Sequence, residues 1–193
     1  MGKKEKTKNK KNGKSPAASE LAQKHAKKTK PAAKPGVETG HLHGQATPAD
    51  AELLLRLYDL RREDVMRRAR NYVAIEFFPE SAEEIMSILQ DFGSERNAFF
   101  RQVLSYWDMA AAMVLTGALN EQLFFMTNGE PYFIYAKFKP FLEQIRAASG
   151  NPRFLTHLEE VANISEDSRT RIEQLQQTIQ RLRHARAAKA HSA

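Results

Sequence analysis

The first 46 residues constrain this chain more than any other stretch, because they cannot form a packed core. They contain twelve lysines, no arginine, three acids and only three large aliphatic residues. So few apolar side chains cannot bury enough surface to offset the entropy lost on ordering. We therefore expect residues 1–46 to be a disordered, lysine-rich tail and residues 47–193 to be the folded domain.

The charge of the chain is divided between these two parts. The chain has a formal net charge of +7, while the twelve lysines and three acids of the tail alone give +9. The remaining residues contain 18 basic and 20 acidic side chains, a net charge of −2. This division is typical of an arm for an anionic partner and not of a basic folded surface.

The tail composition predicts sequence-independent association with nucleic acid or ribosomes. Lysine is a mobile point charge that contacts phosphate but cannot read guanine in the bidentate manner of arginine. The tail has no Phe, Tyr or Trp on which bases could stack. A solubilising extension without a partner is the alternative. The candidate phosphate-binding residues are Lys3, Lys4, Lys6, Lys8, Lys10, Lys11, Lys14, Lys27, Lys28 and Lys30.

Several classes of site are not predicted. The absence of cysteine excludes disulfides and thiolate chemistry and is consistent with the cytoplasm. The longest apolar stretch, residues 103–119, is interrupted by Asp108 and is shorter than the roughly 20 residues of a membrane span. His41 and His43 lack a preorganised geometry. We expect a cytoplasmic protein with no membrane span, metal or cofactor.

Start and stop signals predict an all-α fold, an irregular bundle of about six or seven helices around residues 98–115. Thr47 and Pro48 are expected to begin a helix that runs to about Phe77. Its apolar stripe changes direction near residues 61–64, where we expect a bend or a change of neighbours. A kink is expected at Pro140, and later helix starts are indicated by Ser81, Ser94, Asn120, Pro131 and Ser165.

The first helix has a cluster of arginines that resembles a nucleic-acid patch, but neighbouring acids predict that it neutralises itself. Glu63–Arg67 and Asp64–Arg68 have the i,i+4 spacing and orientation of favourable ion pairs. We expect a largely self-neutralised face formed by Arg61, Arg62, Arg67, Arg68 and Arg70.

A polar stripe crosses the first half of the otherwise apolar central helix. It is the solvent face of an amphipathic helix, or it lines a polar cleft walled by Tyr106 and Trp107. A buried carboxylate on this stripe would need a partner, for which an arginine of the first helix is expected. The residues of the stripe are Asn97, Arg101, Ser105 and Asp108.

The C-terminal segment, residues 165–190, is expected to form one long helix with a short apolar seam. The spacing of the seam residues is that of a coiled coil, but it covers only two heptads. Packing back on the domain and self-association as a homodimer are therefore both open. The seam consists of Ile172, Leu175, Ile179 and Leu182.

No catalytic residues are predicted. There is no Ser/His or Cys/His pair, and His157 and His184 lie on surface-like helices. We expect a non-enzymatic interaction protein that acts through its tail. The alternative is a small-ligand-binding or catalytic helical domain that uses a cleft around Arg101 and Asp108.

Four segments resemble a family of bacterial all-helical proteins known as conserved hypothetical proteins. They lie between Leu55 and Arg146 and read LYDLRREDVMRRAR, FGSERNAFFRQVLSYWDMAAAMVL, GALNE and PYFIYAKFKPFL. The resemblance implies a helical bacterial domain and assigns no activity or site residue. The lysine-rich tail is not part of the family pattern.

Overall fold

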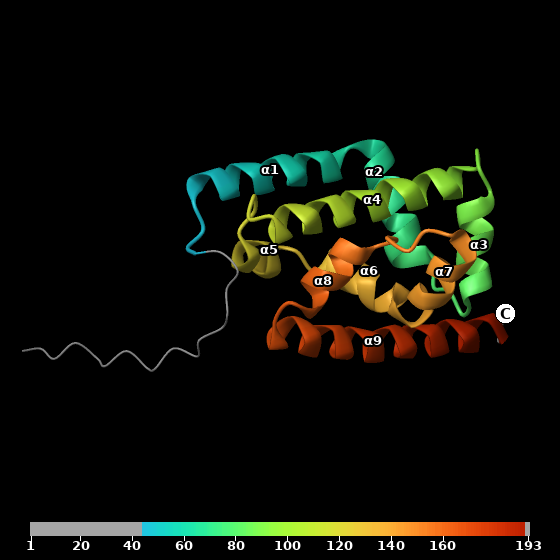
Figure 1. Cartoon of the computed structure of the whole chain (residues 1–193). Coiled ribbons are helices and arrows are strands. Elements are labelled where there is room, and N and C mark those ends of the chain that lie inside the picture. The colour runs from blue at the N-terminus through green and yellow to red at the C-terminus, as the bar shows by residue number, and fades with distance from the viewer. Residues whose placement is uncertain (1–43, 192–193) are drawn as a thin grey trace, which may run out of the picture. The chain divides into compact units, whose positions relative to one another are not determined.

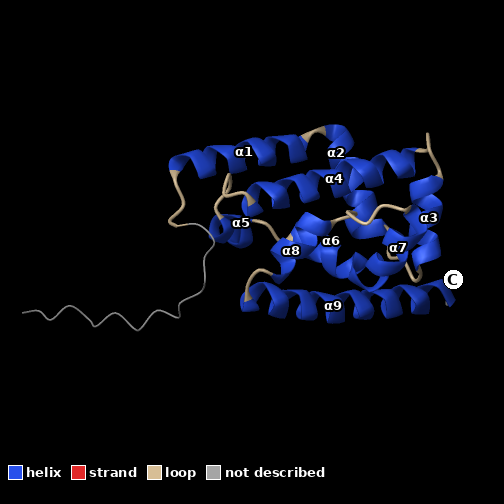
Figure 2. Ribbon diagram, viewed as in Figure 1, coloured by secondary structure: helices blue, strands red, loops and turns tan. Residues whose placement is uncertain are grey.

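The computed structural model describes residues 44–191, except the side chains of residues 187 and 189–191, and all of them lie in one unit of the chain, Thr39–Ala193. Helices make up this region and no strand occurs in it (Figure 2). The expected all-α fold is confirmed. Most of the lysine-rich tail, with all ten candidate lysines, lies outside the described residues.

The first expected helix is divided into three parts. These are α1 (Pro48–Arg62), α2 (Asp64–Arg70) and a π-helical turn, η1 (Asn71–Glu76). The extended backbone of Glu63, with ψ 142°, interrupts the helix within the region where the apolar stripe changes direction. The bend therefore follows the packing pattern, because the two halves face different neighbours.

Local capping fixes the starts of the next helices. These are α3 (Ala82–Gln90), the central α4 (Glu95–Leu115) and α5 (Glu121–Thr127). Their N-cap side chains accept hydrogen bonds from backbone N–H groups of the first turn, which otherwise have no partner in the helix. The three caps are Ser81, Ser94 and Asn120, as expected.

Proline and glycine divide the C-terminal half. A 3-10 turn containing Pro140, η2 (Lys139–Phe141), separates α6 (Glu130–Phe138) from α7 (Leu142–Ser149). Gly150, with φ +64°, ends α7 in the left-handed conformation that glycine tolerates. The chain then forms α8 (Thr156–Asn163) and α9 (Glu166–His191).

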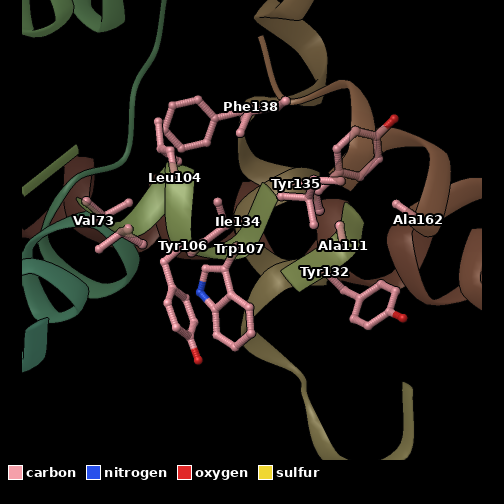
Figure 3. Packing of buried hydrophobic residues seen from close by; sticks show 14 of the residues in the cluster. Val73, Leu104, Tyr106, Trp107, Ala111, Tyr132, Ile134, Tyr135, Phe138 and Ala162 are labelled. Atoms are coloured by element: carbon pink, nitrogen blue, oxygen red, sulfur yellow. The ribbon is translucent and has the colours of Figure 1, made fainter. Parts of the chain in front are cut away.

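The helices enclose α4, which packs against α2, α3 and α8, while α9 runs along α6 and α8 (Figure 1). Aromatic side chains of α4 and α6 fill much of the interior, as the cluster around Trp107, Tyr132 and Phe138 shows (Figure 3). The rings of Phe100 and Phe138 meet edge to face with centroids 5.8 Å apart. This core packs against the inner face of α4 and leaves its opposite face exposed.

Candidate functional site

An open groove runs beside the N-terminal half of α4, where three parts of the chain meet. Its volume is about 740 Å³. The end of α3, the exposed face of α4 and the loop between α7 and α8 form its walls. The lining residues are Leu89, Phe92, Ala98, Arg101, Gln102, Leu104, Ser105, Asp108, Asn151, Arg153, Phe154 and Leu155.

The loop wall of the groove is held by hydrogen bonds from within the domain. The guanidinium of Arg146 donates to the carbonyl oxygen of Phe154 from Nε at 3.0 Å and from Nη2 at 2.9 Å. It also forms an ion pair with Glu159 at 2.8 Å. Leu155 is the one non-glycine residue with positive φ in the described part of the chain. It occupies the N-cap position of α8, where its aliphatic side chain cannot accept a hydrogen bond.

Asp108 supplies that missing cap from α4. One of its carboxylate oxygens accepts from the backbone N–H of Leu158 at 3.0 Å. The other lies 2.8 Å from Nδ1 of His157. The expectation that a first-helix arginine would pair with Asp108 is wrong, because the topology brings the start of α8 to this carboxylate instead.

Arg101 and Arg153 are the cationic side chains of the groove lining. Both are exposed, and within residues 44–191 neither guanidinium forms an ion pair or hydrogen bond with a carboxylate. Asp108, the acidic lining residue, already has both oxygens engaged. Two guanidinium groups against one carboxylate leave the groove with a net positive charge, which favours an anionic ligand.

The structure unites three of the four stripe residues in this groove and separates the fourth. Asn97 is buried, and its side-chain amide donates to the carbonyl oxygens of Ile88 at 3.0 Å and Leu89 at 2.9 Å. It therefore caps the C-terminal end of α3 and does not line the cleft.

The expectation that Tyr106 and Trp107 form the walls of this groove is also wrong. Tyr106 and Trp107 point into the core on the other side of α4, where the Tyr106 hydroxyl donates to the carbonyl oxygen of Leu57 at 2.7 Å. Burial raises the pKa of Tyr106 to about 12. The walls come instead from the apolar side chains at the end of α3 and in the α7–α8 loop, which the helical stripe alone could not reveal.

A second polar cluster lies around Glu130, whose side chain is only 14% exposed. Nε of Arg70 lies 2.9 Å from both carboxylate oxygens, Nη2 of Arg61 lies 3.4 Å from one, and Nε1 of Trp107 donates to the other at 3.1 Å. The hydrogen bond to Glu130 raises the pKa of Arg70. The guanidinium of Arg61 also stacks over the Trp107 ring at 4.9 Å. This cluster joins α1, α2, α4 and α6.

Two further arginines of the first helical segment are paired at the surface, whereas Arg62 has no carboxylate partner within residues 44–191 and lies over the ring of Tyr58 at 6.0 Å. Arg67 pairs with Asp64, and Nη1 of Arg68 lies 3.1 Å from a carboxylate oxygen of Glu95 on α4. The expected partners were Glu63 for Arg67 and Asp64 for Arg68, but Arg67 instead pairs with the residue three positions before it and Arg68 with an acid of another helix. The arginines of α2 are nevertheless neutralised by neighbouring acids.

Lys137 is fully buried and caps the end of the π-helical turn. Its ammonium donates to the carbonyl oxygens of Val73 at 2.8 Å, Ala74 at 2.9 Å and Phe77 at 2.8 Å. Burial, reinforced by the positive charges of Arg186 and Arg183, lowers the pKa of Lys137 to about 7. No signal in the sequence points to this residue, because a lysine inside an aromatic helix is ordinarily exposed.

Comparison with known proteins identifies the domain. A family model described as Domain of unknown function (DUF4760) matches residues 46–165, more than half of the chain. The chain belongs to the DUF4760 family. No curated protein and no solved structure matches it.

The DUF4760 match covers the groove, the Glu130 cluster and Lys137, but it ends before α9. Nevertheless α9 packs on the matched region, with Ile172 and Ile179 of the expected seam buried in the core. Leu175 is partly buried and Leu182 is 40% exposed. Of the two alternatives for the seam, the structure has it packed back on the domain.

Each helix within residues 44–191 is too short or too polar to traverse a lipid bilayer. No group of three His, Asp or Glu side chains in that region is arranged to hold a metal ion. His25, His41 and His43 lie outside it.

Proposed function

We propose that this chain is a non-enzymatic interaction protein of the cytoplasm whose lysine-rich tail associates with nucleic acid or ribosomes without sequence preference. The observation that carries the proposal is the division of charge, +9 in the tail against −2 in the rest of the chain. Multiple lysine–phosphate contacts provide affinity but no base recognition.

The domain supports this division because most arginines of its first helical segment are already paired with acids of the domain. Arg61 and Arg70 bind Glu130, and Arg68 binds Glu95. A guanidinium that already shares a carboxylate gains less from a phosphate than a tail lysine does. The tail is therefore the better polyanion-binding element.

The attachment of the tail also favours this function. Asn120, the N-cap of α5, donates from its side-chain amide to the carbonyl oxygen of Gly44 at 2.7 Å. Its backbone N–H donates to Asp50 at 2.7 Å, which fixes the start of α1. The chain is thus anchored to the domain just after the lysine-rich residues, and the domain does not need the tail to complete its first helix.

Salt titration on one labelled DNA duplex tests the proposal. If six to eight lysines contact phosphate, affinity should fall by at least about a thousandfold between roughly 50 and 200 mM salt. A variant in which six lysines become glutamine should show a much flatter salt dependence. The six positions are Lys3, Lys4, Lys6, Lys8, Lys10 and Lys11.

The matched control changes Arg67 and Arg68 to glutamine, and it should leave the salt dependence almost unaltered. The reverse ranking of the two variants would place the binding surface on α2. No measurable binding by the wild type at about 50 mM salt would refute the proposal for both surfaces. A scrambled duplex should bind equally well, because no tail residue reads a base edge.

A second candidate function, favoured by the open cationic groove, is the binding of a small ligand beside Arg101 and Asp108. Its volume of about 740 Å³ falls within the range of small-ligand sites, roughly 300–1,000 Å³. Apolar walls with a few polar groups are also typical of such sites. Isothermal titration calorimetry of small anions on wild type and on Arg101→Gln tests this candidate.

A further inference from the structure

The groove beside α4 leaves apolar surface exposed at its rim. Phe92, just after α3, is 80% exposed, and the partly buried Phe154 lines the same groove from the α7–α8 loop. Covering an exposed phenyl ring removes apolar area from water, which is favourable in proportion to that area. An apolar ligand would gain this contribution in a groove that is already open in the structure.

The charges of the groove select the head group of such a ligand. Arg101 and Arg153 have no carboxylate partner among the described residues, whereas both oxygens of Asp108 are engaged by α8. Guanidinium groups bind carboxylates with paired, charge-assisted hydrogen bonds. The lysine-rich tail is a poor occupant, because its charge has the same sign as these arginines.

We propose that the groove binds a free fatty acid, with the carboxylate at Arg101 and Arg153 and the acyl chain along Phe92 and Phe154. The volume of the open groove, about 740 Å³, is sufficient for a single acyl chain. The polar side chains of Gln102 and Ser105 on the exposed face of α4 do not favour insertion into a bilayer. This inference rests on the groove as a ligand site and is independent of the tail's association with nucleic acid.

Calorimetric titration of monomeric octanoate, decanoate and dodecanoate into the full chain tests the proposal. The six tail lysines named above are changed to glutamine, and the salt is held at about 150 mM, so that tail contacts are removed or screened. Affinity should rise about threefold to fourfold for each added methylene that the groove buries. Dodecanol should bind more weakly than dodecanoate.

Variants of exposed residues locate the binding without threatening the fold. Arg101→Gln combined with Arg153→Gln should weaken dodecanoate about tenfold, as expected for two exposed charge pairs. Phe92→Ala should weaken it several-fold. Arg181→Gln is the matched control on α9, remote in sequence and absent from the groove lining, and should have no effect.

Three outcomes would overturn the inference: equal affinities for dodecanol and dodecanoate, unchanged affinity in the double arginine variant, or binding to anionic phospholipid vesicles without binding of the monomeric acid. The inference would also be overturned if the wild type bound dodecanoate and the variant with six tail lysines changed to glutamine did not. That result would assign the carboxylate to the tail. The DNA titration is a separate measurement, so each proposal can fail without the other.

Discussion

Lys137 is the group whose titration should be most visible in the stability of this protein. Its side chain is 0% exposed, and burial lowers its pKa from 10.5 to about 7. In the unfolded chain the ammonium has its ordinary pKa near 10.4. Between these two values the unfolded state holds about one proton more than the folded state, so the free energy of unfolding rises with pH.

The size of the effect follows from the two pKa values. The slope approaches about 1.4 kcal/mol per pH unit, and integration from pH 7.0 to 9.5 gives a gain of about 3 kcal/mol. Below pH 7 the lysine becomes protonated in both states, and its contribution to the slope disappears. Lys137→Met keeps a long apolar side chain but removes the titrating group, so this gain should be absent from the variant.

Urea unfolding at a series of pH values, on wild type and variant, measures the difference directly. Lys139→Met, at the exposed neighbouring lysine, is the matched control and should follow the wild type. Subtracting the variant's pH profile of unfolding free energy from that of the wild type cancels the contributions of groups that titrate equally in both proteins. Parallel profiles for wild type and Lys137→Met would refute the reasoning, because the three carbonyl oxygens would then hold the ammonium at its ordinary pKa.

Three further variants test the packing. Glu130→Gln should lower the free energy of unfolding by about 3 kcal/mol in urea, because it leaves partly buried arginines without a counterion, whereas Glu52→Gln, in an exposed pair, should change it by less than about 1 kcal/mol. Deletion of residues 1–43 should leave the thermal midpoint within a few degrees; a larger loss would show that the tail packs on the domain. Ile179→Asp should unfold the domain by circular dichroism, whereas Leu182→Asp should remain folded; a folded Ile179→Asp protein would contradict the packing of α9.

The helices could be predicted from the sequence because their signals are local. Ser81, Ser94 and Asn120 cap helices within three residues of themselves, and Pro140 breaks the helix in which it lies. These interactions depend on backbone geometry over a single turn. No knowledge of the tertiary fold is needed to recognise them.

The partners of charged residues could not be predicted because they lie far apart in the chain. His157 reaches Asp108 from 49 residues away, and Glu130 lies 60 residues from Arg70. The π-helical turn also departs from the spacing of 100° per residue on which helical stripes are read. Sequence periodicity thus identified the exposed face of α4 but not the elements that wall it.

The aromatic walls were misassigned for a related reason. Tyr106 and Trp107 follow Ser105 directly, so each successive residue is rotated by about 100° around the helix. That rotation carries both rings from the groove into the core, where they meet the first helical segment. Adjacency in sequence places two residues on the same helix but not on the same face.

The two proposed binding activities should respond differently to salt concentration. Tail binding depends on many lysine–phosphate contacts, so its affinity should fall with roughly the fifth to seventh power of salt concentration. A single carboxylate at Arg101 and Arg153 involves one charge, and the acyl chain contributes through burial that salt does not weaken. Raising the salt should therefore release nucleic acid while leaving a fatty acid bound. If both ligands were released together, a single cationic surface would serve both, and the division of charge between tail and groove would have no functional meaning.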